Sequence, residues 1–254
     1  LITATHTHTG VVVGDSLRAM YFYADSQISK VKAYADALER KLLALVGRAL
    51  SDLQPARLEW GRGQTDFAVN RRNNAQDQVP QLRAQGKLKG PVDHDVPILV
   101  VRDQQGRLSV ILCGYACHAT TLASFEWSGD WPGFAQSELE QRYAGVQAMV
   151  WAGCGADQNP LPRRKVELAR KYGKMLAEAV EGTLSNGLRP VQGSLTASYA
   201  EIDLPWAEIP SQQELEATSK SENRYEASRA KLLLERLKRN GKLSPTYPFP
   251  IQTW

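Results

Sequence analysis

Apolar and polar residues recur along the chain with periods that predict both helices and strands. Apolar side chains return every three or four positions over residues 25–49, 166–184 and 212–240, a spacing typical of helices with one apolar face. We expect the apolar face of the first helix to be buried. A shorter helix is predicted over residues 133–143, because Pro132 suits the first turn of a helix.

Short apolar or alternating runs predict the strands. Residues 97–103 and 107–119 read as a hairpin around a Gln-Gln-Gly turn. Residues 1–13 read as a strand that enters a loop, and further strands are expected at residues 56–60, 146–153 and 193–206. Residues 61–91 are polar and irregular, and loops of that length are typically functional or disordered. The order of elements predicts an α/β or α+β fold in which a mixed β-sheet is flanked by helices.

Both ends of the sequence read as interrupted elements. The chain does not begin with Met, and Leu1 already lies in a strand-like run. Its last residues, PFPIQTW, read as the start of another strand. We therefore expect one domain over residues 1–254 that is truncated at both ends, so the missing leader says nothing about localisation.

Composition excludes several classes of protein. The 254 residues are 43% hydrophobic and 23% charged with a net charge of +4, which is ordinary for a globular chain. No basic patch is interleaved with aromatic residues, so no nucleic-acid partner is expected. No apolar run is long enough for a transmembrane segment. Three cysteines without a CxxC spacing do not indicate a disulfide framework, and the oligomeric state stays unknown.

Two of the four histidines stand one residue apart, at His6 and His8. Residues two apart on an extended chain point to the same side, so both imidazoles can face one cation, or one can face a cation and the other a substrate. Two histidines that cap turns or face solvent fit the pattern equally well. His94 lies in a polar turn, which indicates solvated surface.

The other candidates lie where predicted strands end. His118 closes a strand, a position where sites gather, although a core histidine would look the same. The turn GCGADQNP follows another strand and presents Asp157 and Asn159, but it could also be an ordinary strand-to-helix connection. Arg71, in VNRRNN, suits a carboxylate or an oxyanion, or is a solvated loop arginine.

Common catalytic signatures are missing from the sequence. It contains no GxSxG elbow, no GxGxxG loop and no phosphate-binding loop. A metal-centred hypothesis remains, with His6 and His118 as ligands and His8 beside them. Two imidazoles do not complete a catalytic zinc site, which typically has three protein ligands and one open position.

Seven motifs, taken in order, resemble the amino-terminal catalytic domain of the neutral/alkaline non-lysosomal ceramidases. They are ATHTHTG, LQPARLEWGRG, VNRR, VDHDVPIL, CHATTL, SGDWPGFAQ and GCGADQNP. Their order and spacing agree with the family over roughly residues 1–165. The resemblance implies a hydrolase of lipid amides such as sphingolipids that is secreted or periplasmic.

The resemblance also implies residue roles. His6 and His118 would bind zinc, while His8 and Arg71 would face the reacting amide. In the family a later glutamate and tyrosine complete the zinc site, so the remaining ligands are expected beyond residue 254. Asn159 stands where ceramidases carry a serine that is taken to act in catalysis, after the shared Asp157. The family's Ser-Gly-Pro is also replaced, here by Thr9-Gly10-Val11.

We therefore expect a zinc-dependent hydrolase that cleaves an amide bond with metal-activated water and whose substrate need not be ceramide. Asn159 is no nucleophile, but it can donate a hydrogen bond to an oxyanion. Two alternatives stay open. One is a barrel-type metal amidohydrolase, against which the missing eightfold βα rhythm argues. The other is a non-catalytic domain that binds a lipid or a carbohydrate.

Overall fold

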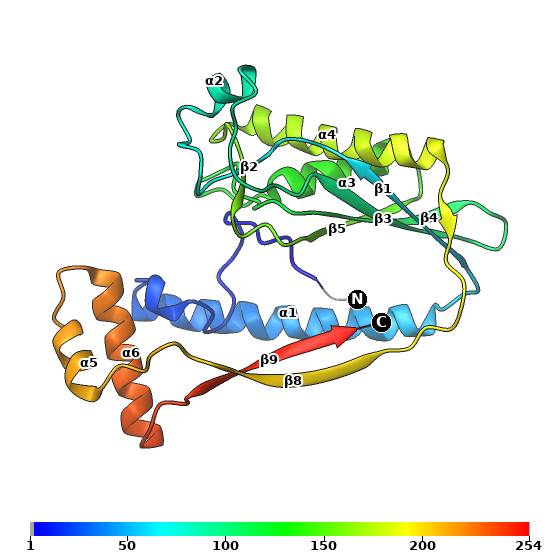
Figure 1. Ribbon diagram of the computed structural model, residues 1–254. Coiled ribbons are helices and arrows are strands. Elements are labelled where there is room, and N and C mark those ends of the chain that lie inside the picture. Colours follow the sequence, from blue (N-terminus) through cyan, green and yellow to red (C-terminus); the bar gives the residue numbers. More distant parts are fainter. Residues whose placement is uncertain (1–2, 254) are drawn as a thin grey trace. The chain divides into compact units, whose positions relative to one another are not determined.

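The computed structural model describes residues 3–253, which form two compact units (Figure 1). Unit 1 comprises Leu1–Val11 and Leu50–Gln192, and unit 2 comprises Val12–Ala49 and Gly193–Trp254. Residues 1, 2 and 254 lie outside the described part of the chain. The chain groups into these two units by its internal contacts. The single domain expected over residues 1–254 stays a prediction.

The core of unit 1 is a five-stranded mixed sheet. Its order is β5 (Gln147–Ala152), β4 (Leu108–Tyr115), β3 (Asp95–Arg102), β1 (Arg57–Gln64) and β7 (Arg189–Pro190). β4 and β5 are parallel, and the other neighbours are antiparallel. The mixed α/β class predicted from the sequence is confirmed. The antiparallel pairs contradict the barrel alternative, whose strands would all be parallel.

Two helices cover one face of this sheet. α3 (Asp130–Arg142) and α4 (Val166–Asn186) pack against each other, with α3 on β5 and α4 on β1 and β3 (Figure 1). Alternate β3 residues, Val96, Ile98 and Val100, are buried beneath them, as strand periodicity requires. A Cβ on Gly63 would lie 2.7 Å from the Ala179 carbonyl oxygen, so glycine allows α4 to approach β1 closely.

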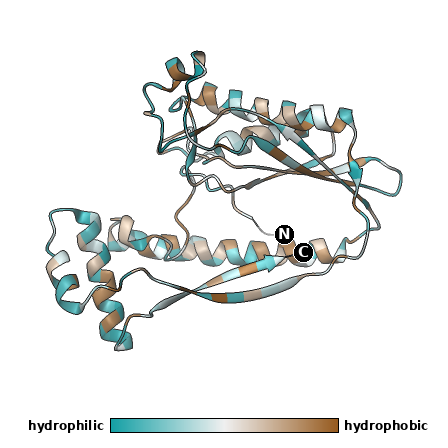
Figure 2. Cartoon of the chain, in the orientation of Figure 1, coloured by the Kyte–Doolittle hydropathy of each residue, from teal (hydrophilic) through white to brown (hydrophobic). Residues whose placement is uncertain are grey.

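The opposite face of the sheet presents a row of large apolar residues. The register aligns Trp60, Leu99, Leu112 and Met149 across four neighbouring strands. Trp60 is 43% exposed and Met149 is 39% exposed. Figure 2 shows apolar residues along the strands of this sheet. Unlike the face beneath the helices, this row is only partly buried.

One strand of a second, small sheet lies within the segment that the sequence predicts as a long loop. β2 (Ala68–Asn70) pairs antiparallel with β6 (Gln158–Pro160), and all the residues of both strands are buried. α2 (Val79–Ala84) follows in the same segment. The prediction of an irregular loop over residues 61–91 is therefore wrong. Pairing with a strand almost 90 residues later orders this polar stretch.

The strand expected at the start of residues 1–13, before the chain enters a loop, is not found in the described part of that range. Residues 3–13 contain no regular helix or strand. Residues 1 and 2 lie outside the described residues. The segment is held by threonine hydroxyls instead of a strand ladder, as the site geometry below explains.

Unit 2 contains helices and a two-stranded sheet. Its elements are η1 (Arg18–Met20), most of α1 (Asp25–Ser51), β8 (Ser198–Pro205), α5 (Gln212–Thr218), α6 (Arg224–Asn240) and β9 (Thr246–Thr253). β8 and β9 pair antiparallel, so the strand-like end of the sequence is indeed a strand. The single helix expected over residues 212–240 is two helices. The Asn223 side chain accepts from the Tyr225 N–H and caps α6, which separates it from α5.

Helix α1 forms where the periodicity places it, but its apolar face is not buried. None of its residues is buried, and Ile28 and Val46 are each 42% exposed. Figure 2 shows apolar and polar residues mixed along its length. The predicted burial of this face is therefore wrong.

All three cysteines are free, and Cys113 and Cys117 are buried in the core. Burial raises the pKa of the Cys113 thiol to about 12, so this residue is a packing element. Among the described residues, none of the helices combines the length and apolar character that crossing a bilayer requires.

Candidate metal centre and active site

Three histidines of unit 1 form a cluster. The ring centroids of His6 and His118 lie 5.0 Å apart, those of His6 and His8 5.1 Å, and those of His8 and His118 5.9 Å. One ring nitrogen of each lies within 4.8 Å of the others. The structure thus brings His6 and His118 together, as the metal hypothesis requires. Their role as ligands stays a prediction.

Threonines fix the segment that carries His6 and His8. The hydroxyls of Thr7 and Thr9 donate to the Ser128 carbonyl at 3.1 and 2.9 Å, and the Ser128 N–H donates to the Thr9 carbonyl at 3.1 Å. The backbone N–H of His8 donates to the Ala119 carbonyl at 3.3 Å, next to His118. In this alternating sequence the threonine side chains anchor the segment, and the histidine side chains form the cluster.

His6 has an unusual backbone conformation. Its φ is +55°, in the left-handed region that residues with a Cβ rarely adopt. Such strain persists only where the surroundings enforce it, and it gathers at functional sites. The positive φ is a backbone feature that His6 shares with few other described non-glycine residues, among them Asp130 and Arg164.

The hydrogen bonds of His118 define its tautomer. Its Nδ1 lies 2.7 Å from the Gly155 carbonyl oxygen and 3.3 Å from that of Gln158. Because carbonyl oxygens only accept, Nδ1 carries the proton, which leaves the Nε2 lone pair free for a ligand. Metal-binding histidines typically donate their other N–H to such a carbonyl. The Trp131 indole also donates to the His118 carbonyl at 2.9 Å.

Glycines bring the turn after β5 against the end of β4. A Cβ on Gly155 would lie 2.5 Å from the Cys117 amide nitrogen, and one on Gly153 would lie 3.1 Å from that of Ala116. Only glycine permits this approach, which places the Gly155 carbonyl at His118. Because β4 and β5 are parallel, their carboxyl ends share one edge of the sheet, and the histidine cluster lies there.

The surroundings of His8 and His118 favour their neutral imidazoles. Burial lowers the pKa of His8, and His6, His118, Arg71 and Arg163 lower it further by repelling its protonated form. Burial also lowers the pKa of His118, against the opposing effect of the hydrogen bond to Gly155. A metal binds the neutral form of imidazole.

Asp157 links the turn to the segment that carries Arg71. The Arg71 N–H donates to the Asp157 carbonyl at 2.8 Å, and the Asp157 carboxylate accepts from the Asn70 amide at 3.2 Å. The Arg71 Nε is buried without a hydrogen-bond partner in the described residues. Asn70, which the sequence interpretation missed, also accepts from the N–H groups of Arg72 and Asn73. The run of asparagines in VNRRNN is the signal for it.

Asn159 lies in β6, where a short chain of hydrogen bonds ties it to a second arginine. Its side chain is buried, and its Oδ1 accepts from the Thr120 hydroxyl at 3.5 Å. The same hydroxyl oxygen accepts from the Arg163 Nη1 at 3.4 Å. Sequence analysis missed both Thr120 and Arg163, although Thr120 directly follows the CHA of the His118 motif. Asn159 thus lies in the same part of unit 1 as the histidine cluster.

The donor set fits a zinc ion. Imidazole nitrogen is a common zinc ligand, and four-coordinate zinc holds its nitrogen ligands about 3.4 Å apart. Ring nitrogens within 4.8 Å of one another need only small side-chain rotations to reach that spacing. At least one further ligand or water is needed to complete four-coordination when two or three histidines bind.

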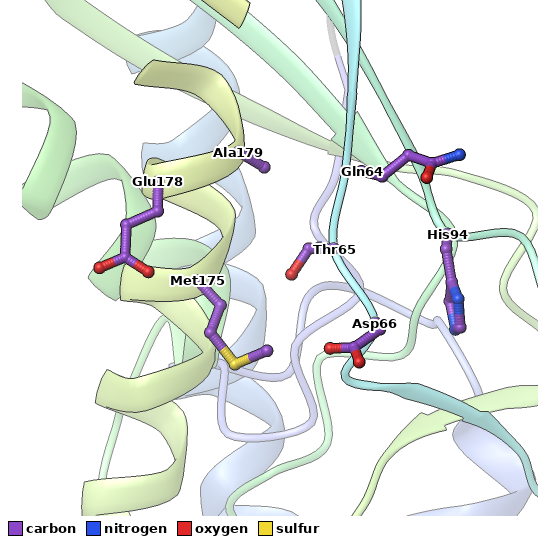
Figure 3. Close-up of a pocket in the computed structure, with 7 residues that line it drawn as sticks. All are labelled: Gln64, Thr65, Asp66, His94, Met175, Glu178 and Ala179. Carbon is purple, nitrogen blue, oxygen red and sulfur yellow. The ribbon is translucent and has the colours of Figure 1, made fainter. Parts of the chain in front are cut away.

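His94, the fourth histidine, lines a different cavity. It is half-buried, and its Nε2 lies 3.1 Å from the Ala68 carbonyl oxygen, so the prediction of solvated surface is wrong. This cavity of about 440 Å³ lies between α4 and the end of β1 (Figure 3). It is lined by Gln64, Thr65, Asp66, His94, Met175, Glu178 and Ala179. None of these residues belongs to the histidine cluster.

Comparison with known proteins identifies the fold. No protein-family model and no curated protein matches the chain. Solved structures do match, among them one described as a ceramidase complexed with C2 and a neutral ceramidase from Pseudomonas aeruginosa. Their TM-scores are 0.60 and 0.59, at 21% and 22% sequence identity. Each match covers 79% of this chain but 33% of the ceramidase, so the chain spans about a third of their length. Over 79% of its length the chain has a fold similar to part of the neutral ceramidase structure.

Proposed function

We propose that the chain is the metal-binding part of a zinc-dependent hydrolase that cleaves an N-acyl amide bond. The observation that carries the proposal is the convergence of His6, His8 and His118 at one edge of the sheet. The ceramidase fold supports the hydrolase class. In this proposal the remaining metal ligands come from outside residues 1–254.

The three histidines have different roles in this proposal. His6 and His118 hold the metal, and the Gly155 carbonyl fixes the ring of His118 so that Nε2 is directed to the ligand. Bound zinc supplies a water with a pKa of about 7 and polarises the scissile carbonyl. His8 faces the substrate, accepts a proton from the attacking water and passes it to the departing amine.

Arg71 and Asn159 act on the developing oxyanion. Arg71 is half-buried, and in this proposal its guanidinium donates to a substrate oxygen. The Oδ1 of Asn159 is occupied by Thr120, which leaves its Nδ2 to donate. Asp157 positions Arg71 through the backbone and Asn70. In this proposal Arg71 and Asn159 supply hydrogen-bond donors in place of a nucleophilic serine.

The substrate in this proposal is an N-acyl amide with a lipid chain, and ceramide is one candidate. Secretion or export to the periplasm belongs to the same proposal, since it rests on the ceramidase resemblance.

Removal of the metal tests the function. Dialysis of the full protein against a chelator should abolish hydrolysis of a panel of acyl-amides that includes ceramide, and added zinc should restore it. Far-ultraviolet circular dichroism before and after dialysis verifies that the fold survives. Unchanged turnover in the zinc-free protein would contradict the mechanism. Absence of turnover across the panel in a zinc-loaded protein would favour a non-catalytic binding domain.

A further inference from the structure

Two arginines beside the histidine cluster lack a carboxylate partner. Among the described residues, neither Arg71 nor Arg163 forms an ion pair, whereas Arg62, Arg102 and Arg142 all do. Arg71 also keeps a buried Nε without a partner. Unpaired cations in partly buried positions are costly, so their placement calls for a ligand.

Arg163 is held toward the site by neutral groups. Its Nε donates to the Gln76 side chain at 2.8 Å, and its Nη1 contacts the Thr120 hydroxyl at 3.4 Å. No hydrogen bond among the described residues uses its Nη2. Thr120 is two residues from His118 and hydrogen-bonded to Asn159. The guanidinium is therefore oriented by neutral acceptors, with one nitrogen left free.

The charges around the cluster repel one another. Burial lowers the pKa of Arg163, and the nearby Arg164 and Arg71 lower it further. Arg71 and Arg163 both act on His8 in the same direction. A bound metal would add more positive charge to this region. A neutral amide uses one of these cations, for its oxyanion, and leaves the second without a function.

We infer that the substrate carries a carboxylate close to the scissile amide, as an N-acyl amino acid does, and that Arg163 binds this carboxylate. The inference rests on the proposed function and narrows its substrate class. Guanidinium is the side chain whose planar fork matches a carboxylate. Hydrolysis breaks the amide C–N bond and forms a C–O bond with water. The products are a fatty acid and a free amino acid whose nitrogen takes the proton.

The test compares two substrates with the same acyl chain and similar head groups, N-lauroylglycine and N-lauroylethanolamine. The full protein should favour the glycine conjugate in kcat/KM. Arg163→Met should lower that value on the order of 10²-fold, mainly through KM, as expected when one partner of a charged pair is removed. Its effect on the neutral ethanolamide should stay within about threefold. Arg164→Met, an equal charge change at the exposed neighbour, is the control.

Two further measurements keep the outcome decisive. Arg163→Lys retains the charge without the fork and should keep the preference for the glycine conjugate at a higher KM. Calorimetry on the metal-free protein should show N-lauroylglycine binding that Arg163→Met weakens, independently of turnover. Equal hydrolysis of both substrates by the unaltered protein, or an equal loss on both in Arg163→Met, would overturn the inference and leave the amide hydrolase intact. If the protein hydrolyses neither substrate, the result counts against the proposed function. The calorimetric comparison of the unaltered protein with Arg163→Met then shows whether Arg163 binds the carboxylate of N-lauroylglycine.

Discussion

The proton on Nδ1 of His118 determines which of its nitrogens a ligand can use. Two carbonyl groups, from Gly155 and Gln158, accept from this nitrogen. A lone histidine at the end of a strand could equally be a core residue, and its sequence neighbours do not distinguish the two cases. The acceptors come from a turn almost 40 residues later, and their geometry favours the ligand role.

Asn159 provides the sharpest test at the scale of one side chain. Asn159→Ala removes the donor proposed for the oxyanion and should lower kcat by about 10²–10³, the usual cost of losing one such donor. Steady-state kinetics on the best amide of the panel measures this effect. Metal content should be unchanged, because Asn159 is not a proposed ligand.

Asn159→Asp is the matched control for this prediction. It keeps the size of the side chain and an oxygen toward Thr120, but it replaces the amide donor with a negative charge. Both variants should therefore lose activity together. An Asn159→Ala protein that retains full kcat would show that Asn159 only packs within β6.

The sequence offers the three histidines as candidates, with their roles implied by the family resemblance, but it does not indicate the residues that support them. His6, His8 and His118 are rare residues in distinctive positions. Thr120 and Arg163 are common residues whose relation to the site depends on contacts between segments 43 residues apart. No local pattern encodes such a contact, so only the folded chain reveals it.

At the scale of elements, the turn between β5 and β6 holds the site together. Gly155→Ala should force this turn away from Cys117, since an added Cβ would lie 2.5 Å from a backbone nitrogen. We expect a loss of about 1–3 kcal/mol in the free energy of unfolding, typical of overpacking. Metal affinity should fall about 10–100-fold, as expected when a hydrogen bond to a ligand histidine is displaced. Denaturant unfolding and a zinc titration measure the two effects.

Gly182→Ala is the control for the glycine prediction. A Cβ at Gly182, in the body of α4, would meet nothing within 4 Å, and alanine favours a helix. This variant should be as stable as the parent or more stable, with the same zinc affinity. A Gly155→Ala protein that behaves like Gly182→Ala would mean that the turn does not position His118.

Elements with strong periodicity were predictable, and those that depend on distant pairing were not. The hairpin β3–β4, strand β5 and helix α4 follow the apolar pattern closely. The three-residue strands β2 and β6 contain polar residues and form only because they pair with each other. The burial of α1 was overestimated, because periodicity predicts an apolar face but not the element that covers it.

At the scale of the whole molecule, the candidate site belongs to unit 1 alone. Unit 1 consists of two chain segments, Leu1–Val11 and Leu50–Gln192, and both contribute residues to the site. The fold likeness to neutral ceramidase covers about a third of that protein's length, and identity is 22% or lower. The fold is therefore shared, whereas the catalytic assignment depends on whether the histidine cluster binds metal.

Metal stoichiometry in the histidine variants tests this claim most directly. Mass spectrometry of the purified full protein should find about one zinc per chain, and the same for His94→Ala, since His94 lies in a separate cavity. His8→Ala should keep its zinc while kcat falls about 10²–10⁴-fold, the range for a lost acid–base group. His6→Ala and His118→Ala should each bind almost none. Full zinc occupancy in either of these two proteins would contradict the account.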